Sequence, residues 1–212
     1  FRNQRLFLSN ISHELKNPLN VIVSQVEVTL DKDRSKNDYQ NTLQSVLSDV
    51  KELNEVAEKL MQLARINADD STIRLHPLRI DELIWQSKDS LLKNHPDYII
   101  YFDVHNLPDQ ESYLQVNGNE QLLRTAFVNL MDNGCKFSPE KTVKVTLSFT
   151  EEGIARVEIK DKGPGIPEQE LPHVFDPFYR SPQTASIKGS GIGLSLVNSI
   201  LKLHQIDIKV ES

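Results

Sequence analysis

The spacing of apolar residues divides the chain into a helical first third and a mixed remainder. Over residues 4–30 apolar positions recur at steps of three and four, as on a helix with one apolar stripe. A polar stretch follows at residues 31–37, and a second stripe runs without Gly or Pro over residues 38–68. The two stripes contain Leu8, Ile11, Leu15, Ile22, Val26 and Leu30, then Leu43, Val46, Val50, Leu53, Ala57, Leu60 and Ala64. This pattern predicts an antiparallel helical hairpin over residues 1–68.

A hairpin of two helices buries little apolar surface, so each helix would leave an apolar strip facing water. Pairing of two hairpins into a four-helix bundle covers such strips. We therefore predict a homodimer formed through the hairpin. The alternative is that the free face packs on the next domain of the same chain.

The remainder mixes short strand-like and helical patterns. Residues 69–73 are the predicted linker, and residues 74–212 are a predicted second domain. Strands are expected at residues 73–75, 98–104, 113–116, 143–149, 154–160 and 206–210, and helices at 80–93, 120–136 and 192–203. The helices would cover one face of a mixed sheet, which makes the fold class α+β: an antiparallel helical hairpin followed by an α/β sandwich domain.

Composition narrows the class of protein. Hydrophobic residues make up 38% of the chain and charged residues 25%, as in globular proteins. A net charge of −6 disfavours a nucleic-acid partner. The single cysteine, Cys135, excludes an intrachain disulfide and is expected to be a packed residue. The sequence contains no run of about 18 apolar residues, the length that a membrane-spanning helix needs.

One histidine lies off the apolar stripe of the first helix. At about 100° per residue, His13 points away from the stripe and toward solvent, with Asn17 one turn later on the same face. Glu14 is the nearest carboxylate and could orient the imidazole or act as a base. Pro18 removes one helical hydrogen bond and is expected to bend the helix. An exposed histidine on a helix is by itself more often without function.

Polar side chains gather on one face of the helix expected at residues 120–136. Asn129 and Asn133 are four residues apart, and Lys136 follows on the same side. Two amides and an ammonium suit a phosphate chain with its metal, and Asn133 is the predicted Mg²⁺ ligand. The alternative is a polar surface strip.

Two glycine-containing segments follow. Asp161, at the end of an expected strand, precedes Gly163, Gly165 and Ile166. The carboxylate can accept a hydrogen bond from an exocyclic amine, and the glycines let the backbone approach a flat ligand. The second segment opens a helix with Gly189, Gly191, Gly193 and Leu194, and exposed backbone N–H groups there suit phosphate. The dinucleotide-binding fingerprint is the rival interpretation of the second segment, but its βαβ context is lacking.

Five motifs in one order resemble those of a known family. FLSNISHELKNPL, from Phe7 to Leu19, resembles the H box of sensor histidine kinases, with Lys16 for the usual Arg and Asn17 for the commoner Thr. The segment from Asn129 to Phe137 is similar to the N box of GHKL-type ATP-binding domains, with Gly134 where Ala is usual. The two glycine segments resemble the glycine boxes, and Phe175–Arg180 the F box between them.

This resemblance implies an ATP-dependent histidine kinase with Mg²⁺. His13 would be phosphorylated and would pass the group to an aspartate of a response regulator receiver domain, and Asn17 would position water in a phosphatase step. Residues 168–188 would form a lid over the triphosphate. The chain would be the cytoplasmic portion of an inner-membrane sensor, reaching the membrane only through an upstream segment, and a last glycine-rich strand would lie beyond Ser212. The resemblance also implies nucleotide contacts for Phe137, Gly165, Ile166, Phe178, Arg180 and Leu194.

Two other functions compete with this prediction. GHKL-type ATPases that hydrolyse ATP carry a glutamate as base at the first N-box position, where this chain has Asn129. A dimeric scaffold with an inactive pocket would lack some of the polar groups that are present. The remaining histidines are expected to have no catalytic role: His76, His95, His105, His173 and His204.

Overall fold

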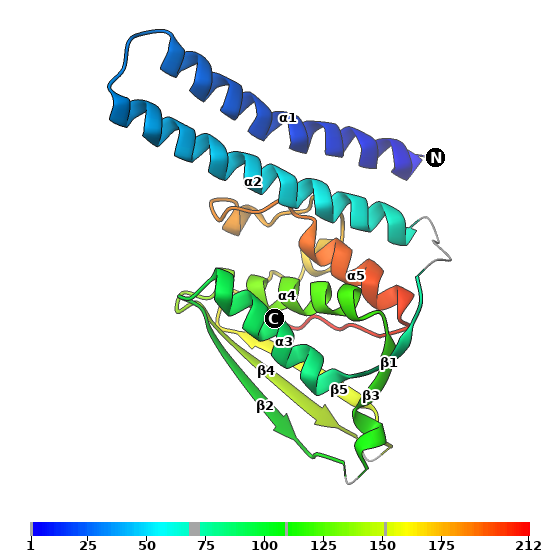
Figure 1. The fold of residues 1–212 in the computed structure, drawn as a ribbon. Coiled ribbons are helices and arrows are strands. Elements are labelled where there is room, and N and C mark those ends of the chain that lie inside the picture. The colour runs from blue at the N-terminus through cyan, green and yellow to red at the C-terminus, as the bar shows by residue number, and fades with distance from the viewer. Residues whose placement is uncertain (1, 68–72, 109, 151) are drawn as a thin grey trace. The chain divides into compact units, whose positions relative to one another are not determined.

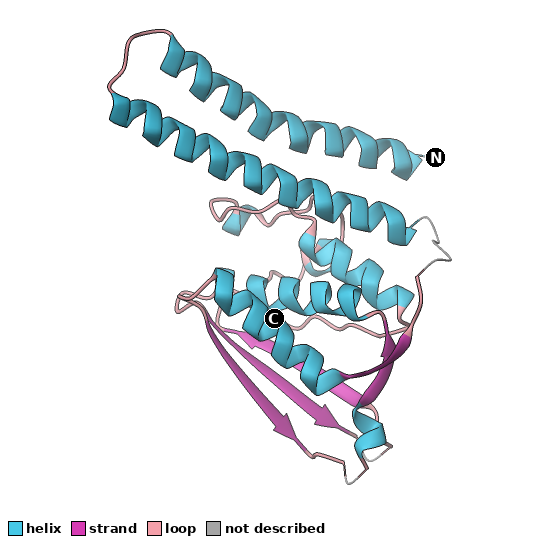
Figure 2. Cartoon of the chain, in the orientation of Figure 1, coloured by secondary structure: helices cyan, strands magenta, loops and turns pink. Residues whose placement is uncertain are grey.

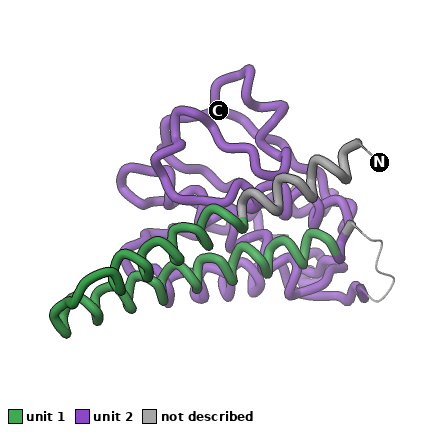
Figure 3. Tube along the Cα trace, turned by 90° about the horizontal axis from the view of Figure 1, so that it is seen from above, with its two compact units in different colours: residues 1–64 green, residues 65–212 purple. Residues whose placement is uncertain are grey.

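The computed structural model describes residues 2–67, 73–108, 110–150 and 152–212, and the side chains of the first helix from Leu15 onward. The chain forms two compact units, a hairpin unit (Phe1–Ala64) and a second unit (Arg65–Ser212), which are coloured separately in Figure 3. The predicted linker at residues 69–73 lies almost wholly outside the described residues. No helix in the described part of the chain is long and apolar enough to cross a membrane.

The hairpin unit contains two long helices, as predicted (Figure 1). Helix α1 spans Arg2–Leu30 and continues through Pro18, and α2 spans Lys36–Asn67. A reciprocal cap starts α2: the backbone N of Ser35 donates to Asp38 Oδ2 (3.1 Å), and the backbone N of Asp38 donates to Ser35 Oγ (3.2 Å). Two otherwise unpaired N–H groups are thereby satisfied, so the turn ends sharply in a helix.

Polar side chains pair across the face between the two helices. Gln25 Nε2 donates to Asp49 Oδ2 at 3.0 Å, and the hydroxyls of Thr29 and Thr42 lie 3.1 Å apart. An adjacent apolar row remains exposed, and we call it the exposed stripe: Leu19, Val23, Val26, Leu30, Leu43, Leu47 and Val50, each 38–71% exposed. Val26, Leu30, Leu43 and Val50, which belong to the predicted stripes, are thus exposed to solvent rather than buried between the two helices. Each helix has two neighbouring rows with nearly the same spacing, and the sequence does not say which one meets the other helix.

In its described residues, the second unit contains two sheets and three α-helices. Strands β1 and β3 pair antiparallel, while β2 is parallel to β4 and β4 is antiparallel to β5, in the order β2-β4-β5. The strands are β1 (His76–Arg79), β2 (Ile99–His105), β3 (Gln115–Gly118), β4 (Thr142–Phe149) and β5 (Ala155–Asp161). The helices are α3 (Ile80–Asn94), α4 (Glu120–Phe137) and α5 (Gly193–Leu203), with short 3₁₀ turns at Glu111–Leu114, Leu171–His173 and Pro182–Thr184.

The core of the second unit lies between the larger sheet and the helices (Figure 2). Alternate residues of β4, among them Val143, Val145 and Leu147, have no exposed surface because they point toward the helices. Helix α4 contacts all three strands of this sheet and packs against α3 on one side and α5 on the other. The predicted α+β fold, with helices on one face of a mixed sheet, is confirmed.

Three predicted strands differ from the structure. Residues 73–75 are not a strand. Backbone pairing with β3 begins only at His76, the first residue of β1, which pairs with Gly118. Residues 113–116 divide between a 3₁₀ turn and β3. Residues 206–210 form no strand. A strand-like pattern becomes a strand only where another backbone accepts its hydrogen bonds.

Candidate functional site

The predicted polar face is formed by the second half of α4. The helix starts at an N-cap, where Asn119 Oδ1 accepts from the backbone N of Leu122 (3.1 Å). Asn129 is only 7% exposed, and its Nδ2 donates to the Thr125 carbonyl at 2.8 Å. Because this bond uses the amide nitrogen, the side-chain oxygen of Asn129 remains available as an acceptor. An oxygen in that position can meet a cation or a donor but cannot contact a phosphate oxygen favourably.

The glycine-rich segment meets this face of α4. Gly193 is the first residue of α5, and a Cβ at this position would lie 3.1 Å from Asn129 Oδ1 and 4.0 Å from Asn133 Nδ2. A Cβ at Gly189 would lie 3.1 Å from Lys136 Nζ. Helix α5 begins without a side-chain cap. Its N-terminal N–H groups, the amides of α4 and the Lys136 ammonium thus converge, which suits a bound polyphosphate.

Asp161 lies beside the same helix. It is exposed at the end of β5, and its Oδ1 accepts from the backbone N of Gly163 at 2.6 Å. A Cβ at Gly134 would lie 2.6 Å from Val143 Cγ2 and 3.6 Å from Asp161 Cβ, so α4 approaches β4 and β5 closely here. Gly163 is also near the backbone of Phe137. The structure therefore brings Asp161 and Gly163 to the end of α4 that carries the two amides.

Gly165 and Ile166 follow in an irregular segment. Gly165 has a φ of +76°, a conformation that glycine adopts without strain. The backbone N of Ile166 donates to Ser212 Oγ. Leu194 is half-buried in the first turn of α5. None of these contacts tests the predicted contact with a nucleotide.

The segment predicted as a lid is attached to the glycine-rich segment. The backbone N of Phe178 donates to the Gly191 carbonyl at 2.9 Å, and both residues have positive φ, +69° and +68°. A Cβ at Gly191 would lie 2.7 Å from the Phe178 carbonyl carbon, so only glycine fits. Arg180 Nη2 donates to the carbonyls of Ala185 and Ile187, both at 2.7 Å. Arg180 thus holds its own loop, and its predicted contact with a nucleotide stays a prediction.

The predicted phosphoacceptor region lies in α1. His13 and Glu14 belong to the helix, but their side chains are outside the described residues. Asn17 is exposed on the same helix. The roles predicted for these three residues therefore stay predictions.

Sequence reasoning missed one polar pair behind the site. The hydroxyl of Tyr98 donates to Asp132 Oδ1 at 3.1 Å, and the Tyr98 ring stacks on His95. Burial, followed by the charge of Asp132, raises the pKa of Tyr98. Burial likewise raises the pKa of the Cys135 thiol to about 12, which agrees with the prediction of a packed residue. Tyr98 and Asp132 are 34 residues apart in the sequence, so no local sequence pattern predicts this pair.

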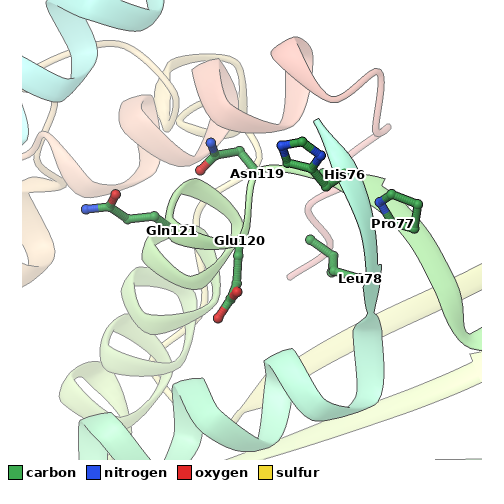
Figure 4. A pocket seen from close by; sticks show the side chains of 7 residues that line it. His76, Pro77, Leu78, Asn119, Glu120 and Gln121 are labelled. Carbon is green, nitrogen blue, oxygen red and sulfur yellow. The ribbon is translucent and has the colours of Figure 1, made fainter. Parts of the chain in front are cut away.

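A surface cleft lies at the opposite end of α4. Its lining residues, all but Gly118 labelled in Figure 4, are His76, Pro77, Leu78, Gly118, Asn119, Glu120 and Gln121. None of the predicted site residues lines it. The cleft is therefore separate from the cluster formed by Asn129, Asn133 and the glycine-rich segment.

Known proteins match both units of the chain. Residues 3–69 match the His Kinase A (phospho-acceptor) domain, and residues 118–212 match the Histidine kinase-, DNA gyrase B-, and HSP90-like ATPase domain. The probable sensor kinase SilS of Salmonella typhimurium is 30% identical over 226 residues, covering 100% of this chain and 43% of that protein. The signal transduction histidine-protein kinase/phosphatase MprB of Mycobacterium leprae is 32% identical, covering 98% of this chain and 40% of that protein.

A solved structure shares the fold. The histidine kinase ThkA, in complex with the response regulator protein TrrA, matches with a TM-score of 0.65 at 17% identity, covering 84% of this chain and 53% of that one. The chain spans less than half the length of the two curated relatives named above. Both domain matches, in this order, agree with the hairpin, the N-box helix and the glycine-rich segment. The chain belongs to the sensor histidine kinase family, with a HisKA phosphoacceptor domain followed by a HATPase_c ATP-binding domain.

Proposed function

We propose that this chain uses ATP to phosphorylate His13 and then transfers the phosphoryl group to an aspartate of a response regulator. The observation that carries the proposal is the meeting of Asn129, Asn133 and the uncapped start of α5 at Gly193. Amide oxygens, backbone N–H groups and the Lys136 ammonium are the groups that a metal-bound triphosphate needs.

The residues around Gly193 fit Mg²⁺ as well as phosphate. Asn129 presents an oxygen because its nitrogen is bound to Thr125, and Asn133 lies one turn further along the same face. Asn133 would hold the ion, which when bound supplies charge neutralisation on the phosphates. Asp161 would accept from the exocyclic amine of adenine, since a carboxylate can only accept.

The reaction at His13 needs an unprotonated imidazole nitrogen. That nitrogen attacks the γ-phosphorus, a P–N bond forms, the bond to the β-phosphate oxygen breaks, and ADP leaves. The proton on the opposite ring nitrogen has to be held by an acceptor, and Glu14 is the nearest carboxylate in sequence. Asn17, exposed one turn along α1, would act in a separate phosphatase step, in which it orients a water molecule that hydrolyses the phosphoaspartate of the regulator to aspartate and inorganic phosphate.

Two partners follow from this function. The exposed stripe of the hairpin unit would be covered by a second copy of the chain, forming a four-helix bundle. The response regulator is the second partner. ThkA is solved in complex with one, and the name of MprB includes a phosphatase, so both activities are expected of this chain.

Simple hydrolysis of ATP is the competing function. An activating base is required to deprotonate water, and Asn129, with its nitrogen bound to Thr125 and its oxygen facing α5, is no base. The phosphoryl group should therefore go to a protein side chain.

Labelled ATP tests the proposal. The protein is incubated with γ-labelled ATP and Mg²⁺, and the label should be stable in base and lost in acid, as for phosphohistidine. His13→Gln should abolish labelling while ATP affinity stays within about twofold, because the substitution lies outside the second unit. Asn20→Gln, an exposed amide change on the same helix, serves as the control. Labelling of His13→Gln at the wild-type level would overturn the assignment.

Two neighbours of His13 separate the two activities. Glu14→Ala should lower the rate of autophosphorylation about 100-fold if the carboxylate acts as a base. Asn17→Ala should leave that rate nearly unchanged and slow dephosphorylation of the cognate regulator. The reverse pattern for Asn17→Ala would mean that this residue positions His13 instead.

A further inference from the structure

His204 forms a bridge that the function proposed above does not include. It is the C-cap residue of α5 and is 8% exposed. Its Nδ1 lies 2.7 Å from the Ile200 carbonyl, and its Nε2 lies 2.9 Å from the backbone N of Asn119. A carbonyl only accepts and a backbone N–H only donates, so Nδ1 carries the proton and Nε2 is the acceptor. The ring is neutral, and both of its nitrogens are used.

The bridge joins the ends of two helices. Asn119 is the N-cap of α4, and it is 85 residues away from His204 in the sequence. Gly118 leaves room for the ring, because a Cβ there would lie 3.3 Å from His204 Cδ2. Figure 4 shows Asn119 at the point where β3 leads into α4. The start of α4 is therefore fastened to the end of α5.

The same two helices meet again at the nucleotide site. There, Gly193 at the start of α5 lies against Asn129 in the second half of α4. Between the two ends the helices pack against each other, and both contain buried side chains, such as Leu123 of α4 and Leu196 of α5. The His204 bond thus joins α4 and α5 at the end that is remote from the predicted phosphate site.

We propose that His204 is a positioning residue for ATP: its bond with Asn119 sets the tilt of α5 and thereby the place of the phosphate-binding N–H groups. This inference rests on the proposed function. Helix α5 has 11 residues, so it is about 16 Å long. A tilt of about 4° at its C-terminal end would move its N-terminal end by about 1 Å, a displacement that can cost a site much of its activity.

Two substitutions separate the two ring nitrogens. His204→Asn places an amide donor near the position of Nδ1, so it keeps the bond to Ile200 but is too short to reach Asn119. His204→Gln places an acceptor oxygen near the position of Nε2 and so keeps the bond to Asn119. Both are polar and similar in size to histidine. His105→Asn, at an exposed position on β2, is the matched control.

The readout compares ATP with adenosine, which lacks the phosphates that α5 would bind. His204→Asn should lower ATP affinity about tenfold, because the phosphate-binding N–H groups of α5 are displaced, and should lower the rate of autophosphorylation as well. Its adenosine affinity should stay within about twofold. His204→Gln and His105→Asn should bind ATP within about threefold of the wild type.

Two results would overturn the proposal. One is wild-type ATP affinity in His204→Asn; the other is an equal loss for ATP and adenosine, which indicates general destabilisation. If His204→Asn does not fold, His204→Gln still decides, because a tenfold loss of ATP affinity in a folded protein that keeps the Asn119 bond contradicts the mechanism. Failure of the wild type to bind ATP would instead refute the proposed function.

Discussion

The hairpin unit and the second unit differ in how many of their apolar side chains they bury. Among the described side chains of residues 15–64, only Leu60 and Leu63 are buried. In the second unit, by contrast, residues such as Ile84, Met131 and Leu196 have no exposed surface. Two helices provide one shared face, whereas a sheet covered by helices encloses side chains on several sides.

The polar groups of the two units are also used differently. In the hairpin unit, Gln25 pairs with Asp49 across the face between the helices, while the apolar residues of the exposed stripe point outward. In the second unit, Asn129 and His204 are buried polar residues, and their hydrogen bonds lie within α4 and between α4 and the end of α5. The first unit is thus suited to association and the second to holding a ligand.

The largest expected effect concerns the exposed stripe. Val50→Glu would bury a carboxylate without a partner in a bundle of two hairpins, so the dimer should weaken by about 3 kcal/mol, roughly 100-fold in dissociation constant. Sedimentation equilibrium measures this. The control is Val28→Glu on the other side of α1, 59% exposed and outside the stripe, which should leave the dimer intact. Equal effects of the two substitutions would mean that the stripe is not the interface.

The next effect concerns the second unit alone. Asn133→Ala should lower the affinity for ATP about 30-fold in the presence of Mg²⁺, because an oxygen ligand of the ion is lost. The loss should be at most a few-fold in EDTA, and calorimetry under both conditions measures it. Asn94→Ala, an exposed amide at the end of α3, should have no effect. The same loss with and without Mg²⁺ would show that Asn133 is not a metal ligand.

Gly191→Ala should lower both stability and ATP affinity. Its φ of +68° and its contact with the Phe178 backbone leave no room for a Cβ, so we expect a cost of about 1–2 kcal/mol and an ATP affinity about tenfold lower. Gly153→Ala is the matched control, since Gly153 also has a positive φ (+79°) and lies against the Tyr113 ring. Urea unfolding should report a similar loss for both, and only Gly191→Ala should weaken ATP binding. If both substitutions weaken ATP binding, the loss reflects general destabilisation and not the position of Gly191 beside Phe178.

The smallest effect concerns the polar pair of the hairpin unit. Gln25→Leu should destabilise the hairpin by about 1 kcal/mol, because Asp49 loses its donor. The double substitution Gln25→Leu with Asp49→Leu should recover that loss or exceed the wild type, since an apolar pair replaces a half-buried polar one. Thermal unfolding followed by the helical signal measures both variants. A double variant that is less stable than the single one would mean that the polar pair stabilises the hairpin beyond its hydrogen bond.

Much of the architecture could be predicted from local patterns. The helices α3, α4 and α5 and the strands β2, β4 and β5 lie within one or two residues of their predicted positions. Their apolar spacing differs clearly between helix and strand, and it reflects burial on one face. Gly193 and Asn129 could be placed in one site because each belongs to a motif whose arrangement the family resemblance supplies.

Other features could not be read from local patterns. The exposed stripe and the inner face of the hairpin have the same helical spacing, so Val26 and Thr29 are equally plausible contacts of α2 until the helices are packed. The strand expected at residues 73–75 begins at His76 instead, because β3 offers its hydrogen bonds only there.

The sequence by itself determined the helices and the central strands, because propensity and periodicity act over short stretches of chain. Its motifs predicted which residues bind ATP and carry the phosphoryl group. Only the tertiary structure decided that Asn129 turns its oxygen toward α5, that Arg180 holds its own loop, and that His204 bonds to Asn119. These choices depend on backbone groups far apart in the chain, whose donors and acceptors become partners only when packing brings them within about 3 Å.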